Sequence, residues 1–376
     1  MKLLIIGQTP PPFGGQSINI EKMIHILKEF DFDYKFIRMD FSDEMSENGT
    51  VSFKKIFRLV KIFFRICFQL LVYRPDYTYY PPCGPEKVPM LRDIILLFPI
   101  RLFRYKVIYH FHAGGLSEGH SMLSPVLKKF YEFAYAKPDH AICMSPFGSR
   151  DPLFLQAKQI TYIPYGITAN TIETVKKISD DIITVLFVGV CRETKGILDF
   201  IEIIRMARLS GHNIVGKIVG NIFSEKEKNA IDAAVSEKIV TYEGIKTGEE
   251  KNKMYRSAHM FLFPTFFEHE SFPTVNLEAY SFGLPVISTK WRGVNDQVKH
   301  GVTGFIHDVH DVRGMADSII KMVRDEKLYT EISRNAFREY IMHYRSEEIQ
   351  NKILDFYTTL FNSVNPAETN RQEALA

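Results

Sequence analysis

Residues 260–288 read MFLFPTFFEHESFPTVNLEAYSFGLPVIS, and this stretch decides the fold class. It contains two short apolar runs typical of buried strands, Met260 to Pro264 and Pro285 to Ser288. Between them we expect a loop and then a helix. Pro273 suits the first helical position, because its missing N–H is not needed there, and Gly283 suits the helix end. A strand, loop, helix and strand in this order predict a parallel α/β fold.

The same alternation of short β-branched runs and longer helical patterns continues through both halves of the chain. An amphipathic helix is predicted over 17–30, with Ser17 as its N-cap. We therefore expect two doubly wound Rossmann-like sheets, with a ligand at the carboxyl ends of their strands. The predicted strands are 2–6, 34–39, 77–80, 106–110 and 140–144 in the first half, and 183–188, 214–219, 239–242, 260–264 and 285–288 in the second.

This pattern divides the chain into an N-terminal domain, residues 1–170, and a C-terminal domain, residues 171–345. A last helix is predicted over 346–362. Ile349, Ile353, Phe356 or Tyr357, and Leu360 form one apolar stripe on it, so we expect it to pack back onto the first domain. Residues 363–376 are polar and aperiodic, which predicts a disordered tail.

The composition excludes several classes of protein. Hydrophobic residues make up 45% of the 376 and charged residues 24%, which is typical of a folded globular chain. A net charge of +3 gives no bulk attraction for nucleic acid. The four cysteines form no C-x-x-C pair, which argues against zinc and disulfides and for the cytoplasm. The first apolar run is too short for a signal peptide, and no stretch of about 18 residues lacks charge.

The loop and helix after residue 264 combine backbone donors with carboxylates. Thr274 and Val275 fall in the first helical turn, where free N–H groups and the positive end of the helix dipole attract phosphate. Glu270 precedes this turn, and Glu278 lies one turn further on. Carboxylates suit the donor hydroxyls of sugar and ribose. The plainer alternative is an ordinary helix with carboxylates on its surface.

Residues 270–288, ESFPTVNLEAYSFGLPVIS, resemble the E-x(7)-E segment of family 4 retaining glycosyltransferases. The resemblance implies the GT-B architecture, with two Rossmann-like doubly wound domains facing a central cleft. It also implies that Glu270 contacts sugar hydroxyls, that Glu278 binds the ribose, and that the turn between them holds the donor diphosphate. The donor-binding residues implied by this segment are Phe272, Pro273, Thr274, Val275 and Glu278.

Residues 187–196, FVGVCRETKG, resemble the family segment G-R-x-x-x-x-K-G, whose Arg and Lys neutralise the diphosphate leaving group. Gly189 and Lys195 keep the family spacing. Val190 stands where the family has Arg, and Arg192 is the candidate replacement. Outside this context Lys195 would be an ordinary solvated lysine at a helix start.

The first domain supplies two further segments of the resemblance. Residues 7–17, GQTPPPFGGQS, lack the G-x-G-x-x-G pattern of nicotinamide sites, and the family places a Gly-Gly loop, here Gly14 and Gly15, against the donor phosphates. Residues 110–115, HFHAGG, resemble the segment whose His lies beside the reacting sugar. Strand alternation puts His110 and His112 on one face, and we favour His112 because it is nearer the loop. No third metal ligand has convincing spacing, so we expect neither a metal nor another cofactor.

Residues 53–71, FKKIFRLVKIFFRICFQLL, form the candidate membrane-facing helix. Basic residues recur at helical spacing on a wide apolar body without an acidic residue, as in helices that lie on anionic membranes. Residues 91–106 have a similar character. The alternative is that both are core helices with basic outer edges.

We therefore predict a glycosyltransferase in the cytoplasm, peripherally bound to the inner face of the membrane, and the family resemblance implies that it retains the configuration of the sugar. It would move a sugar from a UDP- or GDP-sugar to a glycan or polyprenyl-diphosphate-linked acceptor in bacterial surface polysaccharide (O-antigen or capsule) synthesis. Two alternatives are a nucleotide-sugar epimerase of GT-B-like fold and a non-catalytic nucleotide-binding subunit. Tyr165 and Thr168 depart from the family's interdomain I-P-N-G-x-D. In the subunit alternative, these two departures and Val190 would mark lost activity.

Overall fold

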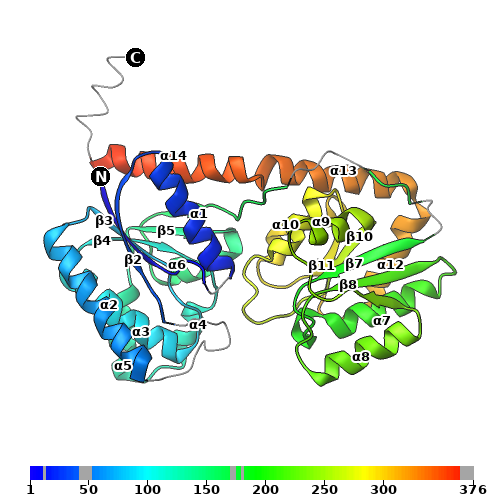
Figure 1. Cartoon of the computed structure of the whole chain (residues 1–376), viewed down its shortest axis with the longest axis horizontal. Helices are drawn as coiled ribbons and strands as arrows, with labels where there is room; N and C mark the ends of the chain where they lie inside the picture. The colour runs from blue at the N-terminus through cyan, green and yellow to red at the C-terminus, as the bar shows by residue number, and fades with distance from the viewer. Residues whose placement is uncertain (12–13, 42–52, 170–174, 179–181, 365–376) are drawn as a thin grey trace, which may run out of the picture. The chain divides into compact units, whose positions relative to one another are not determined.

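The computed structural model describes residues 1–11, 14–41, 53–169, 175–178 and 182–364. The chain divides into two compact units between Tyr165 and Gly166; the first consists of residues 1–165 and 349–376, and the second of residues 166–348 (Figure 1). The sequence analysis placed its boundary between 170 and 171. Within the described residues, no helix is both long enough and apolar enough to cross a bilayer.

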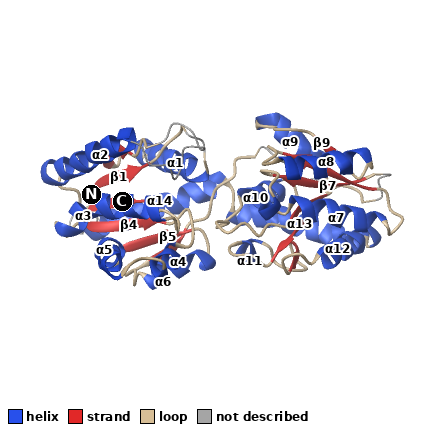
Figure 2. Ribbon diagram, turned by 90° about the horizontal axis from the view of Figure 1, so that it is seen from below, coloured by secondary structure: helices blue, strands red, loops and turns tan. Residues whose placement is uncertain are grey.

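The first unit is built on a six-stranded parallel sheet in the order β2-β1-β3-β4-β5-β6. Strands β1, β4 and β5 of this sheet are labelled in Figure 2. Leu3 of β1 pairs with Tyr34 on one side and Tyr77 on the other. The chain runs from β1 to β2 on one side of β1 and then crosses to β3 on the other side. The loops after β1 and β3 therefore lie at a topological switch point. The strands are β1 Lys2–Gly7, β2 Asp33–Arg38, β3 Tyr77–Tyr80, β4 Lys106–His110, β5 His140–Cys143 and β6 Ile160–Tyr162.

Helices cover both faces of this first sheet. Buried residues of α1 and α14 pack on one face, and buried residues of α2, α3 and α5 pack on the other. Tyr357 of α14 donates a hydrogen bond to Met23 Sδ of α1, 3.1 Å away. The helices are α1 Gly15–Glu29, α2 Phe53–Val72, α3 Lys87–Leu102, α4 Leu116–Ser121, α5 Pro125–Tyr135, the 3-10 helix η2 Pro146–Ser149, α6 Arg150–Phe154 and α14 Ser346–Val364.

The second unit has a parallel sheet in the order β9-β8-β7-β10-β11-β12, which is the Rossmann order 3-2-1-4-5-6. Its switch point lies between β7 and β10. The strands are β7 Ile183–Val188, β8 Ile214–Val219, β9 Val240–Tyr242, β10 Met260–Phe263, β11 Val286–Thr289 and β12 Gly304–His307. The helices are η3 Glu193–Lys195, α7 Ile197–Arg208, α8 Glu225–Ser236, α9 Gly248–Ser257, α10 Thr274–Ser281, α11 Val294–Gln297, α12 Val312–Arg324 and α13 Glu326–His343.

The prediction of two doubly wound α/β sheets is confirmed, but some local predictions are wrong. Gly14, and not Ser17, is the N-cap of α1; Ser17 is the third helical residue, and its hydroxyl accepts a hydrogen bond from the Gly14 N–H at 3.0 Å. Strands β6 and β12 were not predicted. The tail predicted over 363–376 lies outside the described residues from position 365, and positions 363 and 364 belong to α14.

Gly189 after β7 and Gly220 after β8 let the ends of these two strands approach each other closely. Gly220 has φ +148°, and a Cβ added to it would lie 1.7 Å from the carbonyl oxygen of Gly189. No side chain fits such a gap. The loop after β7, which carries Lys195, therefore depends on a bare backbone at Gly220.

We predict that Gly220→Ala destabilises the second unit by at least about 2 kcal/mol, because the new methyl group must displace backbone. Gly211→Ala is the matched control. It also has a positive φ, +87°, but nothing lies within 4 Å of its added Cβ, so we expect a loss of about 1 kcal/mol from φ alone. Urea unfolding followed by fluorescence of the single Trp, which lies in this unit, measures both. Equal losses would contradict the steric account.

Candidate functional site

Two neighbouring strands of the second unit end beside each other and carry the predicted residues. The loop after β7 leads to Arg192 and Lys195, and the loop after β10 leads to Glu270. Gly196, with φ +84°, holds these loops together. A Cβ on Gly196 would lie 2.2 Å from the Pro264 carbonyl oxygen, so only glycine permits this contact.

Lys195 and Glu270 form an ion pair at the switch point. Lys195 Nζ lies 2.5 Å from Glu270 Oε2, with side chains 20% and 9% exposed. Thr265 donates a second hydrogen bond to the same carboxylate oxygen, at 3.2 Å. A carboxylate this far from water needs such partners, because an unpaired buried charge is strongly destabilising. The structure thus brings Lys195 and Glu270 together.

Hydrogen bonds to backbone fix the loop that carries Glu270. The N–H of Phe266 donates to the Thr194 carbonyl at 2.8 Å, and Trp291 Nε1 donates to the Phe267 carbonyl at 2.7 Å. At the far end of the loop, Gln297 Nε2 donates to the Pro273 carbonyl at 3.1 Å. The loop is therefore held in one geometry at both ends, as a preorganised site requires.

Arg192 lies beside the ion pair without a carboxylate of its own. Its guanidinium is 5.5 Å from the ring centroid of Phe267, and Lys195 Nζ is 4.3 Å from the same centroid. In the part of the chain that the structure describes, Arg192 forms no ion pair. Thr194 between them has a buried hydroxyl that finds no hydrogen-bond partner in the described residues. Arg192 and Thr194 thus leave polar groups available to a ligand.

The first turn of α10 offers two unused backbone donors. The sequence analysis placed Pro273 at the first helical position. In the structure Pro273 is the N-cap, and Thr274 is the first helical residue. Within the described chain, no acceptor lies against the N–H groups of Thr274 and Val275. Phe272 is buried just before the turn. Free N–H groups at the positive end of a helix dipole can bind an anion.

Glu278 is held by two residues that the sequence analysis missed. Lys251 Nζ lies 2.8 Å from Glu278 Oε1, and the Tyr255 hydroxyl donates to Oε2 at 2.8 Å. Both partners come from α9. The Glu278 carboxylate therefore has a fixed orientation and a neighbouring cation.

In the first unit, four buried side chains form a continuous chain of hydrogen-bonding contacts. Tyr165 OH lies 3.0 Å from His112 Nδ1, and Tyr79 OH lies 3.4 Å from His112 Nε2 and 2.9 Å from His110 Nδ1. The two imidazole rings are 4.0 Å apart, as their predicted common face requires. Both nitrogens of His112 are thus occupied, whereas Nε2 of His110 has no hydrogen-bond partner among the described residues.

Burial keeps both imidazoles neutral. It lowers the pKa of His110 to about 3. Burial, and then the neighbouring His110, hold the pKa of His112 well below its ordinary value of 6.5. Burial also raises the pKa of Tyr79 and of Tyr165. Near neutral pH this cluster therefore acts through hydrogen bonds and not through charge.

Tyr165 also connects this cluster with the predicted glycine loop. A Cβ on Gly15 would lie 4.0 Å from the Tyr165 hydroxyl, and Gly14 caps the helix that follows. The first unit thus brings Gly14, Gly15 and His112 together through a residue that sequence reasoning singled out only as a departure from the family pattern. Tyr79 gave no such signal, because nothing in YTYY distinguishes it from a core residue.

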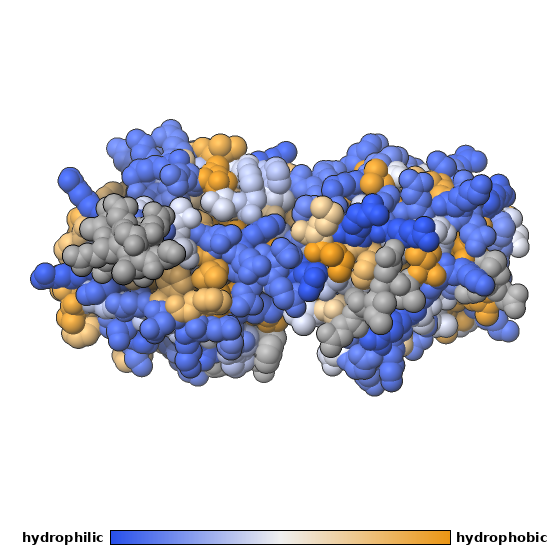
Figure 3. Space-filling view, turned by 90° about the horizontal axis from the view of Figure 1, so that it is seen from above, coloured by the Kyte–Doolittle hydropathy of each residue, from blue (hydrophilic) through white to orange (hydrophobic). Residues whose placement is uncertain are grey.

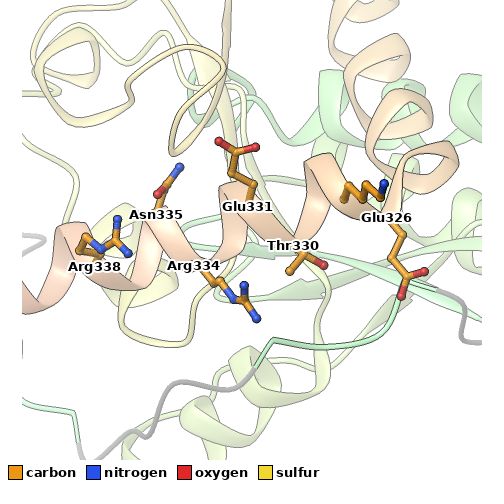
Figure 4. Close-up of a pocket in the computed structure, with 7 residues that line it drawn as sticks. Glu326, Thr330, Glu331, Arg334, Asn335 and Arg338 are labelled. Atoms are coloured by element: carbon orange, nitrogen blue, oxygen red, sulfur yellow. The ribbon is translucent and has the colours of Figure 1, made fainter.

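Other features of the structure lie apart from these residues. A surface groove along α13 is lined by seven side chains of that helix alone, among them Glu331 and Arg334, and none belongs to the predicted site (Figure 4). Among the described residues, no group of three His, Cys, Asp or Glu side chains is placed to hold a metal ion. The four cysteines are free thiols.

Residues 169–339 match the family model described as Glycosyl transferases group 1. CapM, a capsular polysaccharide biosynthesis glycosyltransferase of Staphylococcus aureus, is 27% identical over 187 residues, which are 50% of this chain and 49% of CapM. AmsK, an amylovoran biosynthesis glycosyltransferase of Erwinia amylovora, is 24% identical over 263 residues, 64% of each chain. The chain thus spans about half of CapM and less than two thirds of AmsK.

Two solved structures resemble nearly the whole chain. Sucrose-phosphate synthase from Thermosynechococcus elongatus has a TM-score of 0.68 at 17% identity and covers 96% of this chain and 99% of its own. Anabaena Alr3699/HepE in complex with UDP has a TM-score of 0.67 at 15% identity, covering 96% and 100%. The likeness at this identity shows the fold, and the predicted GT-B class with two Rossmann-like units is confirmed.

The buried histidines predict how the stability of the first unit depends on pH. Unfolded His binds a proton below about pH 6.5, whereas folded His110 stays neutral down to about pH 3. The unfolded state therefore binds more protons in this window, and stability falls as the pH falls. We expect His110 to lower the free energy of unfolding by about 2 kcal/mol between pH 7 and pH 5, and His112 to act in the same direction.

The measurement is amide hydrogen exchange of β1, β3 and β4 at pH 7 and pH 5, corrected for intrinsic rates. His110→Asn should remove the part of this pH dependence that comes from His110. The control is His25→Asn, a substitution in the same unit at a side chain that is 79% exposed, and it should leave the pH dependence unchanged. The same pH dependence in His110→Asn as in the wild type would contradict the assignment.

Proposed function

We propose that this protein is a retaining glycosyltransferase that transfers a sugar from a UDP- or GDP-sugar to a lipid-linked glycan acceptor in bacterial surface polysaccharide (lipopolysaccharide or capsule) synthesis. The observation that carries the proposal is the Lys195–Glu270 pair at the β7–β10 switch point, next in sequence to the open first turn of α10. The group 1 family match over 169–339 supports it. CapM and AmsK, by their names, act in polysaccharide synthesis.

The charges at this site suit a nucleoside diphosphate. Lys195 and Glu270 neutralise each other, so the positive groups left for phosphate are Arg192 and the N–H groups of Thr274 and Val275. Negative charge grows on the diphosphate as the sugar departs, and fixed donors aimed at that charge lower the barrier. This arrangement requires no metal ion.

Glu270 and Glu278 are then the groups for the sugar and the ribose. Glu270 accepts hydrogen bonds from sugar hydroxyls while Lys195 holds its carboxylate in place. Glu278, oriented by Lys251 and Tyr255, accepts from the ribose hydroxyls. The donor would contact the backbone at Gly189, Phe272 and Pro273.

Within the first unit, Gly14 and Gly15 leave backbone accessible to a phosphate group, and the cluster around His112 offers hydrogen bonds to a sugar. His112 is neutral and held on both nitrogens, which fixes its ring. A lipid-linked acceptor places the enzyme in the cytoplasm, peripherally bound to the inner face of the membrane. No cofactor is needed, since the nucleotide sugar is itself the substrate.

The direct test replaces each member of the ion pair by a neutral polar residue. Lys195→Gln and Glu270→Gln should each lower the rate of sugar transfer by at least about 100-fold, because each leaves its partner as an unpaired buried charge and so disturbs the geometry that the transition state uses. The assay follows release of nucleoside diphosphate in the presence of membrane-extracted acceptor.

The Lys299–Glu339 pair is the matched control. It is an ion pair of the same unit, with 2.7 Å between Nζ and Oε2, and it lies outside the proposed site. Lys299→Gln and Glu339→Gln should keep the wild-type rate. A wild-type rate of sugar transfer in Lys195→Gln or Glu270→Gln would contradict the proposal.

A thermal-shift series separates donor binding from the two alternatives. UDP- or GDP-sugar at about 100 times its dissociation constant should stabilise the second unit by about 2.7 kcal/mol, and Lys195→Gln should reduce the shift. Binding without transfer would favour a non-catalytic subunit, and conversion of the donor without acceptor would favour an epimerase. No shift with any nucleotide sugar would contradict all three.

A further inference from the structure

Helix α2 presents a row of large apolar side chains to solvent. Ile62, Ile66 and Leu70 bury one side of the helix in the core. The opposite side is exposed, and Phe53 and Phe57 are 93% and 72% accessible. The exposed apolar residues that continue this side are Val60, Phe64, Phe68 and Leu71. Such a row is not explained by packing within the described residues.

The neighbouring helices extend this apolar face. Helix α3 packs against both α2 and α5, and the three cover the same side of the sheet (Figure 1). The rings of Phe98 from α3 and Phe133 from α5 lie 5.3 Å apart. Figure 3 shows apolar groups among the hydrophilic atoms of this unit, at the left of the view. Further exposed apolar residues are Ile95 and Leu102 on α3 and Val126 and Phe130 on α5.

Basic side chains flank the aromatic row on α2. Lys61 and Arg65 are exposed, stand one turn apart, and line a surface hollow together with Phe64, Phe68 and Gln69. Helix α2 contains five Lys or Arg and no acidic residue. Residues 51–150 carry 15 Lys or Arg against 6 Asp or Glu. The surface is therefore both apolar and positively charged.

We propose that the exposed faces of α2, α3 and α5 bind an anionic phospholipid bilayer, with α2 parallel to the membrane plane. Phenylalanine rings enter the boundary between head groups and acyl chains, and Lys61 and Arg65 contact lipid phosphates. The inference deepens the proposed function and rests on it for a lipid-linked acceptor. A two-fold contact with a second copy fits less well, since it would set this basic surface against itself.

The experiment is flotation of the full-length protein with vesicles. Vesicles of phosphatidylcholine with phosphatidylglycerol should carry the protein to the top of the gradient, and pure phosphatidylcholine should carry much less. Added salt should weaken the binding, because it screens the charged part of the interaction. Absence of the wild-type protein from the anionic vesicles would overturn the proposal.

Two double variants separate the apolar and the charged contributions. Lys61→Gln with Arg65→Gln should weaken partitioning by about 30-fold, at ~1 kcal/mol for each basic residue. Phe57→Ser with Phe64→Ser should weaken it on anionic and neutral vesicles alike. These side chains are exposed, so we expect both proteins to fold and to keep transfer to a lipid-free acceptor.

Matched controls lie on the second unit. Leu209→Ser with Ile245→Ser removes two exposed apolar side chains, and Lys228→Gln with Lys253→Gln removes two exposed charges. Both should float as the wild type does. Wild-type flotation of the α2 variants, or a vesicle-free dimer that the Phe57 and Phe64 substitutions dissociate, would contradict a membrane surface. Flotation without any sugar transfer would leave this inference standing and remove the proposed function.

Discussion

The Lys195–Glu270 ion pair is the interaction on which the account of the second unit depends. It joins two loops that start where the adjacent parallel strands β7 and β10 end. Burying an ion pair costs desolvation that its attraction does little more than offset, so it contributes little to stability. Its physical effect is on geometry and charge. If either side chain moved away, the other would remain as an unpaired buried charge, so the two are held together.

The backbone around the pair is built to keep it in place. Gly196 allows the loop after β7 to touch the Pro264 carbonyl, and the Thr194 carbonyl accepts the Phe266 N–H. The pair is neutral as a whole, so the positive potential of the site falls on Arg192 and on the first turn of α10. An anion is attracted there, while the Glu270 carboxylate stays beside it as a hydrogen-bond acceptor for hydroxyls.

Much of the fold could be predicted from local pattern. Strands such as β7 and β8 are β-branched runs bounded by glycine or polar residues, and their limits were predicted to the residue. Strand β6 was missed because its three residues are half-exposed, and β12 because it begins at a glycine and is followed by charged residues. Ser17 was misplaced because Gly14 can also begin a helix, and its side-chain-free backbone leaves no hydrogen-bonding signature in sequence.

From the sequence, only the site residues that stand in recognisable motifs could be predicted. Loop residues such as Glu270 and Lys195 stand at spacings that the family resemblance recognises, and the structure brings them together. Their partners come from distant segments. Tyr165 reaches His112 across 53 residues, and Lys251 reaches Glu278 across 27, and no periodicity records such contacts. The free nitrogen of His110 likewise follows from tertiary packing around Tyr79.

The central claim is that the second unit binds a nucleoside diphosphate between Arg192 and the first turn of α10. The most direct measurement is a crystal structure of the protein with UDP or GDP. The account predicts phosphate oxygens within hydrogen-bonding distance of the Thr274 and Val275 N–H groups and of the Arg192 guanidinium. Diphosphate density elsewhere, with these three groups still free, would contradict it.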